Sequence, residues 1–508
     1  MRLSLLMALL ILPLMAGDDR PLVVARGADC VGLDPANILD GESAKVSVQV
    51  FETLVRFKPG STEVEPCLAS SWTTSEDGLT WDFTLRDKVI FHDGTGMDAA
   101  AVVFSFQRQM DKNHKAHKGT FEYWALFSDV AAVEATGPMA VRFTLKRPFA
   151  PFLANLAMFS AAIISPASWE KSGEGIIDHP VGTGPYMFVE WRRRESVTLK
   201  AFKEYWGPQA HCPLLVFKVV EKSPVRLALL KKGEIDIADG LSPVEIEAAA
   251  ADKDLRLAKA VGMNVAYLAM NADKGPFKDA RVRRAVRLAL DRSQMALQLF
   301  RGYGQVAVSP LPSCLWGTDP SLKAGSADPE ASRKLLAEAG CAEGFTCTLS
   351  FGNNPRPYLP EPKKAALLVK NALKAVGITV NLEEMEWGSF LEHTKQGKHE
   401  MCLMGWNGDN GDPDNFLTTL LSSETAQLPA MNLSFFRDPQ VDSWLKEAQV
   451  TSKQEAREAL YRQVLRRVDE LCPMVPLFHA EQVAVHAAGV RGFMLHPDGL
   501  RSLGAVQR

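Results

Sequence analysis

The sequence contains few cysteines and no Cys-x-x-Cys pair. Eight cysteines in a chain of 508 residues are too few for a disulfide scaffold. The missing Cys-x-x-Cys spacing excludes a zinc ribbon and a thioredoxin-type redox pair. Beyond the N-terminus there is also no run of about 18 apolar residues, so no internal membrane-spanning helix is expected.

The sequence also lacks an excess of either charge. Its 57 Lys and Arg residues nearly balance 60 Asp and Glu residues, which leaves a net charge of -3. A protein that coats nucleic acid usually presents a basic face, and nothing here requires one, so no nucleic-acid partner is expected. The content of 46% hydrophobic and 23% charged residues is that of a globular protein. The length predicts about three domain-sized units or one large two-lobed body.

The N-terminus differs from the rest of the chain. A short positive start leads into residues 3–15, which are almost entirely apolar and are followed by two small residues. This pattern predicts a secretory signal peptide over residues 1–17, and no cysteine follows that could carry a lipid anchor. Export permits disulfides, and Cys341 and Cys347 are close enough in sequence to form one.

The motifs of common hydrolases are incomplete in this chain. Ser168 and Lys171 fit the Ser-x-x-Lys pattern, but neither Ser-Asp-Asn nor a Gly-x-Ser-x-Gly elbow occurs. His399-Glu400 lacks the second histidine of a zinc-protease helix. We therefore predict that the protein is not an enzyme and has no catalytic residues, with a Ser/Lys hydrolase as the remote alternative.

One segment, residues 407–415, is rich in acidic residues. Asp409, Asp412 and Asp414 suggest calcium, which binds oxygen ligands. Their spacing is not that of an EF-hand, and Pro413 interrupts it, so no metal site is predicted. Asp412 and Asp414 are instead expected to cap and brace the loop.

Much of the chain alternates between helical and extended patterns. Alternating apolar residues predict strands over residues 22–25, 141–145, 187–191, 196–201, 234–237 and 265–271. Amphipathic spacing predicts helices over residues 44–54, 223–232 and 279–300, and a further helix that begins at Asp98. The Asp77-Gly78 pair predicts a hairpin turn within residues 69–86.

The segment from Cys347 to Phe416 is the most informative. It alternates strands and helices in a pattern typical of parallel βαβ units: strands over 347–351, 379–385 and 401–406, and helices over 361–376 and 388–396. The loops after the first and last of these strands contain Arg356 and Asp409. Because the carboxyl ends of parallel strands meet at one edge of a sheet, both side chains are expected to face one ligand. A fixed cation and a fixed anion match the two charged ends of a dipeptide, whose extended backbone spans roughly 3.3–3.6 Å per residue.

Several motifs resemble those of one protein family. They include residues 69–86 with Phe91-His92-Asp93-Gly94, Arg147-Pro148-Phe149, residues 181–186, Tyr205-Trp206-Gly207, Val282-Arg283-Arg284-Ala285 and Asp328-Pro329-Glu330-Ala331. On these motifs the chain resembles the bacterial extracellular solute-binding proteins of the peptide/opine/nickel class (family 5), which serve ATP-driven importers. The sharpest motifs are Arg356-Pro357-Tyr358 and Gly405-Trp406 with residues 408–416, which resemble the dipeptide-binding branch.

The resemblance implies an α/β fold, that of a two-lobed periplasmic binding protein (type II, cluster C) with an additional subdomain on lobe one. After the signal peptide, lobe one is expected to be discontinuous and to combine residues 18–50, 180–262 and 479–508. Residues 51–179 are expected to form the additional subdomain. Residues 263–478 are expected to form lobe two, which carries most ligand contacts.

The resemblance also implies roles for individual residues. In the dipeptide-binding branch an Asp binds the peptide ammonium group and an Arg binds the peptide carboxylate; these roles fall to Asp409 and Arg356. The remaining contacts with the ligand are expected from Trp406, Gly405, Asn407 and Tyr358. Asn407 stands where the branch has Thr, and the chain lacks the cysteine pair that relatives carry just after the acidic loop. The side-chain preference for the ligand is therefore left open.

The function implied by the resemblance is that of a periplasmic component of an ABC importer, acting as a monomer without a cofactor. It would capture dipeptides or short peptides in the cleft between the lobes by hinge closure. It would then deliver them to membrane permease subunits that are coupled to a cytoplasmic ATPase. Haem, antimicrobial or longer peptides, glutathione and nickel remain alternative ligands of the same fold.

Overall fold

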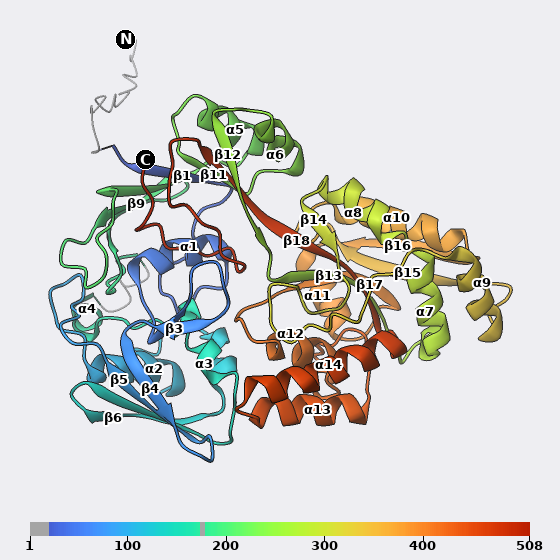
Figure 1. Cartoon of the computed structure of the whole chain (residues 1–508), viewed down its shortest axis with the longest axis horizontal. Helices are drawn as coiled ribbons and strands as arrows, with labels where there is room; N and C mark the ends of the chain where they lie inside the picture. Colours follow the sequence, from blue (N-terminus) through green and yellow to red (C-terminus); the bar gives the residue numbers. More distant parts are fainter. Residues whose placement is uncertain (1–19, 173–177) are drawn as a thin grey trace, which may run out of the picture.

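The computed structural model describes residues 20–172 and 178–508 (Figure 1). The expected signal peptide, residues 1–17, lies outside the described residues. Two α/β lobes share one 12-stranded sheet with the strand order β16-β15-β17-β13-β18-β11-β1-β10-β9-β8, and β12 and β14 pair with β18. In the described part of the chain, no helix has the length and apolar character needed to cross a membrane.

Lobe one is the part built around β1. Its strands are β1 (Leu22–Arg26), β8 (Tyr186–Arg192), β9 (Ser196–Ala201), β10 (Leu214–Val219), β11 (Ile237–Asp239) and β12 (Leu255–Val261). Its helices are α1 (Gly41–Val50), α5 (Ser223–Lys231) and α6 (Pro243–Ala250). Strand β1 runs parallel to both β10 and β11, as expected where helical crossovers join strands.

The subdomain is a separate four-stranded sheet in the order β4-β5-β7-β6, with α2 packed against it. Its strands are β4 (Ala69–Thr74), β5 (Thr80–Leu85), β6 (Val130–Gly137) and β7 (Ala140–Leu145), beside the small pair β2 (Val55–Phe57) and β3 (Val64–Pro66). Its helices are α2 (Ala99–Met110), η1 (Glu122–Phe127), α3 (Phe152–Asn155), η2 (Phe159–Ala161) and α4 (Pro166–Ser172). In its core the ring of Phe143 meets Phe83 and Phe106 edge-on, with centroids 5.6 and 4.9 Å away.

Lobe two is built around β13. Its strands are β13 (Asn264–Met270), β14 (Gly304–Val306), β15 (Phe345–Gly352), β16 (Ile378–Met385), β17 (Met401–Asn407) and β18 (Met474–Ala487). Its helices are η4 (Gly275–Lys278), α7 (Ala280–Ala289), α8 (Arg292–Phe300), α9 (Pro329–Glu338), α10 (Pro362–Lys374), α11 (Trp387–Lys395), α12 (Asp414–Leu421), η5 (Glu424–Ala426), α13 (Pro439–Val450) and α14 (Gln454–Leu471). Every residue of β13 is buried, and successive side chains enter two hydrophobic cores on opposite faces of the sheet.

Two extended segments cross between the lobes. Strand β18 pairs with β13 in lobe two and then with β12 and β11 in lobe one, and β12 continues through residues 262–263 into β13 (Figure 1). The segments are joined where the Asn264 side chain donates to the carbonyl of Ala480 at 3.0 Å and accepts from its N–H at 2.9 Å. A Cβ at Gly262 would lie 2.3 Å from that carbonyl, so the crossing requires glycine.

The structure corrects three element boundaries. The long helix expected over residues 279–300 is broken into α7 and α8, because Leu290 is extended and Asp291 caps α8 by accepting from the N–H of Gln294. The helix expected over residues 44–54 begins earlier and ends at Val50, since Asp40 is its N-cap. The strand expected over residues 234–237 is shifted to Ile237–Asp239.

The suggested bridge between Cys341 and Cys347 is not formed. Within the described residues, none of the cysteines is joined in a disulfide. Cys347 lies on β15 inside the hydrophobic core and is 2% exposed, whereas Cys341 follows α9 and only packs against that core. Burial raises the pKa of Cys347 to about 12, so this thiol is a small apolar side chain of the core.

Candidate ligand-binding site

The parallel arrangement expected around residues 347–416 is confirmed. Strand β15 pairs in parallel with both β16 and β17. The loop that follows β15 contains Arg356, and the loop that follows β17 contains Asp409. Both loops therefore leave the same edge of the lobe-two sheet, the edge at which open α/β sheets bind ligands.

Asp409 is held by hydrogen bonds from two parts of the molecule. The Asn415 amide donates to its Oδ2 at 3.2 Å, and the N–H of Asp409 donates to Oδ1 of Asn415 at 3.1 Å. The Tyr123 hydroxyl, from the subdomain, donates to its Oδ1 at 3.3 Å. Burial raises the pKa of Asp409 to about 6, and these hydrogen bonds only partly oppose the rise. The carboxylate is half-buried, and none of the described residues forms an ion pair with it, so it is chemically suited to bind an ammonium group.

Asn415 also fixes the position of Trp406. The indole N–H of Trp406 donates to Oδ1 of Asn415 at 2.9 Å, so one side chain orients both the carboxylate and the neighbouring ring. At the start of the loop, the N–H of Gly408 donates to the carbonyl of Met263 at 2.7 Å. This contact ties the loop to the crossing segment between the lobes.

The other two acidic residues of the loop, Asp412 and Asp414, brace it through buried contacts, as expected. Asp412 forms a two-pronged ion pair with Arg457, with both N–O distances 2.7 Å, and the two side chains are each 6% exposed. Asp414 accepts hydrogen bonds from Thr418 and Gln449. Burial raises the pKa of Asp414 to about 6. Within the described residues no group of three or more His, Cys, Asp or Glu side chains could hold a metal ion.

Arg356 lies in a tight turn closed by paired backbone hydrogen bonds with Leu359, at 3.0 and 2.9 Å. Its guanidinium group stacks over the ring of Trp387, 3.6 Å from the ring centroid, and remains partly exposed. The stacking positions a permanent cation on a partly exposed turn. The turn follows β15, so this cation lies at the same sheet edge as the loop of Asp409.

Tyr358 and Gly405 pack directly against each other. Tyr358 is 6% exposed, and a Cβ at Gly405 would lie 2.3 Å from its ring, so only glycine fits there. Burial raises the pKa of Tyr358 to about 12. Asn407, by contrast, is exposed and pairs with Asn264 at the end of the sheet. The structure therefore brings Trp406 together with Asp409, and Gly405 together with Tyr358. Arg356 stacks on Trp387 beside Tyr358, where its positive charge opposes the rise in the Tyr358 pKa.

The subdomain reaches the acidic loop through residues that the sequence analysis did not identify. Besides Tyr123, the side chain of Asn155 accepts a hydrogen bond from Asn410. Thr62, between β2 and β3, packs so closely that a Cβ at Gly411 would lie 2.5 Å from its Cβ. The loop that contains Asp409 is therefore in direct contact with the subdomain.

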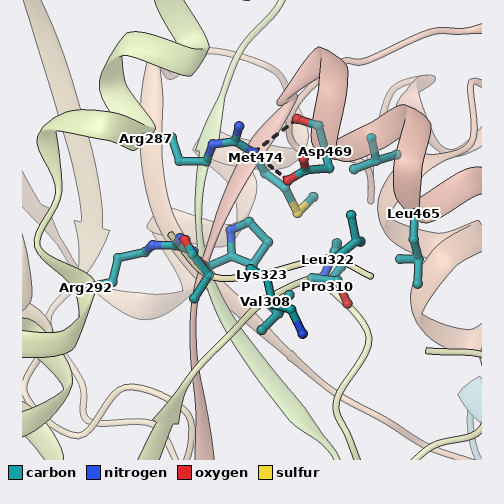
Figure 2. Close-up of a pocket in the computed structure, with 13 residues that line it drawn as sticks. Arg287, Arg292, Val308, Pro310, Leu322, Lys323, Leu465, Asp469 and Met474 are labelled. Atoms are coloured by element: carbon teal, nitrogen blue, oxygen red, sulfur yellow. Dashed lines mark hydrogen bonds and ion pairs between the residues drawn. The ribbon is translucent and has the colours of Figure 1, made fainter. Parts of the chain in front are cut away.

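Two pockets of lobe two lie elsewhere. Figure 2 shows the first, where Arg287 pairs with Asp469 at 2.6 Å and Arg292 donates to backbone carbonyls; its volume of about 20 Å³ suits a water-sized occupant. The second is an open cleft of about 420 Å³ between α12 and α13. Neither is lined by Arg356 or Asp409.

Comparisons with known proteins agree with this architecture. The family model "Bacterial extracellular solute-binding proteins, family 5 Middle" matches residues 63–427. Heme-binding protein A of Haemophilus influenzae is 34% identical over 487 residues, which cover 92% of this chain and 89% of that protein. The dipeptide-binding protein of Escherichia coli is 33% identical over 486 residues, which cover 92% and 91%.

A solved relative extends the likeness to three dimensions. The ABC transporter-associated periplasmic binding protein DppA from Helicobacter pylori, in complex with the peptide STSA, is 34% identical to this chain. The two structures superpose with a TM-score of 0.81, over 96% of this chain and 98% of the other. The two-lobed α/β fold expected from the sequence is therefore confirmed.

Proposed function

Because the chain belongs to the bacterial extracellular solute-binding proteins, family 5, we propose that it is the substrate-binding component of an ABC importer. In this role it captures dipeptides or other short peptides between its lobes and delivers them to membrane permease subunits. It acts in the periplasm, as a monomer and without a cofactor. No catalytic step is assigned to it; Ser168, of the Ser-x-x-Lys pattern, is 8% exposed.

The observation that carries this proposal is the pair of opposite charges at one sheet edge. Asp409 is a shielded carboxylate that takes the peptide ammonium group, and Arg356 is a pre-positioned cation that takes the peptide carboxylate. A hydrogen bond to a charged group contributes about 1.5–3 kcal/mol. Closure of the lobes strengthens both interactions because it lowers the local dielectric constant. Trp406, Tyr358, Gly405 and Asn407 are the further residues proposed to contact the ligand.

The proposed motion is a hinge closure about the two crossing segments. The Asn264–Ala480 contact supports a hinge at residues 262–264 and 480–481, near the expected lobe limits of 262/263 and 478/479. The separate core of the four-stranded sheet supports residues 51–179 as the additional subdomain. These lobe boundaries remain part of the proposal.

Haem is the second candidate ligand, because one relative is named heme-binding protein A. Haem carries two propionate carboxylates and no ammonium group. It could pair with Arg356, but it would leave the shielded carboxylate of Asp409 without a counter-ion. The charge pattern therefore favours a peptide over haem.

A thermal-shift panel tests the proposal. The mature protein is heated with dipeptides, tripeptides, glutathione, haemin or Ni²⁺, each in excess. A ligand present at about 100 times its dissociation constant stabilises the native state by about 2.7 kcal/mol. We expect a clear rise in Tm with short peptides. A rise with haemin or Ni²⁺ and none with any peptide would contradict the proposed ligand.

The affinity for a free dipeptide is expected to fall as the pH drops through about 6. Only the ionised form of Asp409 attracts an ammonium group, and burial raises its pKa to about 6 from the usual 3.8. Below that pKa, protonation competes with the ligand, and Kd rises about tenfold per pH unit. Calorimetry between about pH 8 and pH 5 measures the profile. An affinity that stays constant over this range would argue against Asp409 as the ammonium site.

Replacing Arg356 is expected to weaken the binding of free dipeptides more than the binding of C-terminally amidated dipeptides. The change Arg356→Gln removes the cation but can still pack on Trp387, and an amidated peptide has no carboxylate to lose. The expected loss for the free peptide is about 1.5–3 kcal/mol. Equal losses for the two peptides would contradict the carboxylate role. Arg333→Gln, on the exposed surface of α9, is the matched control.

A further inference from the structure

A second contact joins the subdomain to lobe two, at the C-terminal end of α13 (Figure 1). It is made by the loop that contains the Arg147-Pro148-Phe149 motif, which the proposed ligand contacts leave unexplained. The N–H of Ala150 donates to the backbone carbonyl of Gln449 at 2.7 Å. The guanidinium group of Arg147 donates to the side-chain oxygen of Gln449 at 3.1 Å. We call these two hydrogen bonds the Gln449 contact.

The other end of the Gln449 side chain points to the acidic loop, residues 407–415. Its amide nitrogen donates to Oδ1 of Asp414 at 3.0 Å, and Gln449 is 9% exposed. Asp414 begins α12 at the end of the acidic loop, and its N–H donates to Oδ1 of Asp412 at 3.0 Å. One buried amide therefore links the subdomain to the segment that positions Asp409.

Both ends of the amide are matched to their partners. The oxygen faces a guanidinium donor and the nitrogen faces a carboxylate acceptor, so a single orientation satisfies both. Glutamate would lose the donor and bring a second negative charge to Asp414. Leucine has a similar shape and would lose both hydrogen bonds. On the subdomain side, Arg147 is itself held by Asp129 at 2.9 Å.

We propose that Gln449 is a positioning residue for lobe closure. It couples the acidic loop to the docking of the subdomain on lobe two. This inference rests on the proposed function. When the acidic loop is ordered around a ligand, Asp414 holds the Gln449 amide in the orientation that Arg147 needs. The closed form is then stabilised at a place remote from the hinge.

The first expected effect is on ligand release. Removing the Gln449 side-chain amide destabilises the closed form, whereas a ligand that meets the open form does not depend on this amide. For the probe alanyl-phenylalanine, we expect Gln449→Leu to raise koff about tenfold, the effect of one or two lost hydrogen bonds, with kon nearly unchanged. Gln463→Leu, on the exposed side of α14, is the matched control and should leave both rates unchanged.

A double-mutant cycle separates closure from local bracing of the loop. Arg147→Gln removes the guanidinium hydrogen bond to Gln449 and leaves the Gln449–Asp414 hydrogen bond and the Ala150–Gln449 backbone hydrogen bond in place. If Gln449 positions the closed form, Arg147→Gln also raises koff, and the two changes together do little more than either alone. If Arg147→Gln is silent and only Gln449→Leu raises koff, Gln449 merely braces the loop and the proposal is wrong. Asp129→Asn controls for the loss of the Arg147–Asp129 pair.

Small-angle scattering gives a readout that does not depend on peptide as the ligand. We expect Gln449→Leu and Arg147→Gln to increase the radius of gyration relative to the parent protein and to Gln463→Leu, with Tm close to that of the parent. If no peptide binds the parent protein, the proposed function fails, but this comparison still tests the contact. An unchanged radius of gyration in both variants, or an unchanged koff, would overturn the inference.

Discussion

Asp409→Asn is expected to remove most of the affinity for free dipeptides. Asn has the same shape and can keep the hydrogen bond from Tyr123, but it cannot neutralise an ammonium group. Closure would then bury the peptide charge without a partner, which costs about 2–5 kcal/mol. Isothermal titration calorimetry with alanyl-phenylalanine measures the loss. Asp273→Asn, an exposed carboxylate on lobe two, is the control and should bind as the parent does.

The same variant is expected to remain folded. The folded-state pKa of Asp409, about 6, lies above its usual 3.8, so the ionised carboxylate lowers stability at neutral pH. As the pH falls from about 6 towards 3.8, the folded form takes up a proton before the unfolded form does, so this penalty shrinks. Replacement by Asn removes the penalty, and Tm at neutral pH should be equal to or above that of the parent. A folded Asp409→Asn protein with unchanged affinity would remove Asp409 from the site.

Arg457→Leu is expected to destabilise the protein by about 3–5 kcal/mol. It would leave the Asp412 carboxylate of the acidic loop, which is 6% exposed, without its cationic partner. It would also remove the hydrogen bond from the guanidinium group to the Ala448 carbonyl, 2.9 Å long. Urea unfolding measures the change. The double variant Asp412→Asn/Arg457→Leu should recover part of the loss, because no buried charge then remains unpaired.

A surface pair provides the comparison for this prediction. Arg462 pairs with Glu458 on the same helix at 3.0 Å, and its side chain is 40% exposed. Pairs of this kind contribute about 0–1 kcal/mol, so Arg462→Leu should be nearly neutral. A loss for Arg457→Leu no larger than that for Arg462→Leu would show that the buried pair does not support the loop.

The βαβ core of lobe two was predictable because its signals are local. Short apolar strands and amphipathic helices alternate within residues 347–416, and parallel pairing follows from that alternation. The common sheet edge of the loops that hold Arg356 and Asp409 follows from the same rule. The break between α7 and α8 was missed, since the apolar spacing continues across Leu290 and hides the capping role of Asp291.

The partners that complete the candidate site were not predictable in the same way. Tyr123 lies 286 positions before Asp409 in the sequence, and Asn155 lies 255 positions before Asn410. No periodicity or spacing connects residues so far apart. Asn415 is only six positions from Asp409, yet an amide in a polar loop gives no sign that it will orient both Asp409 and Trp406. The Gln449 contact could not be predicted for the same two reasons: its residues lie far apart in the sequence, and an amide side chain gives no sign of its role.

Calorimetry of the parent protein with one dipeptide in two forms tests the central claim most directly. Free alanyl-phenylalanine carries the ammonium group that Asp409 is proposed to bind, and its N-acetylated form does not. The account predicts binding of the free peptide and a loss of about 2–5 kcal/mol on acetylation. Equal affinity for the two forms would contradict an ammonium site at Asp409.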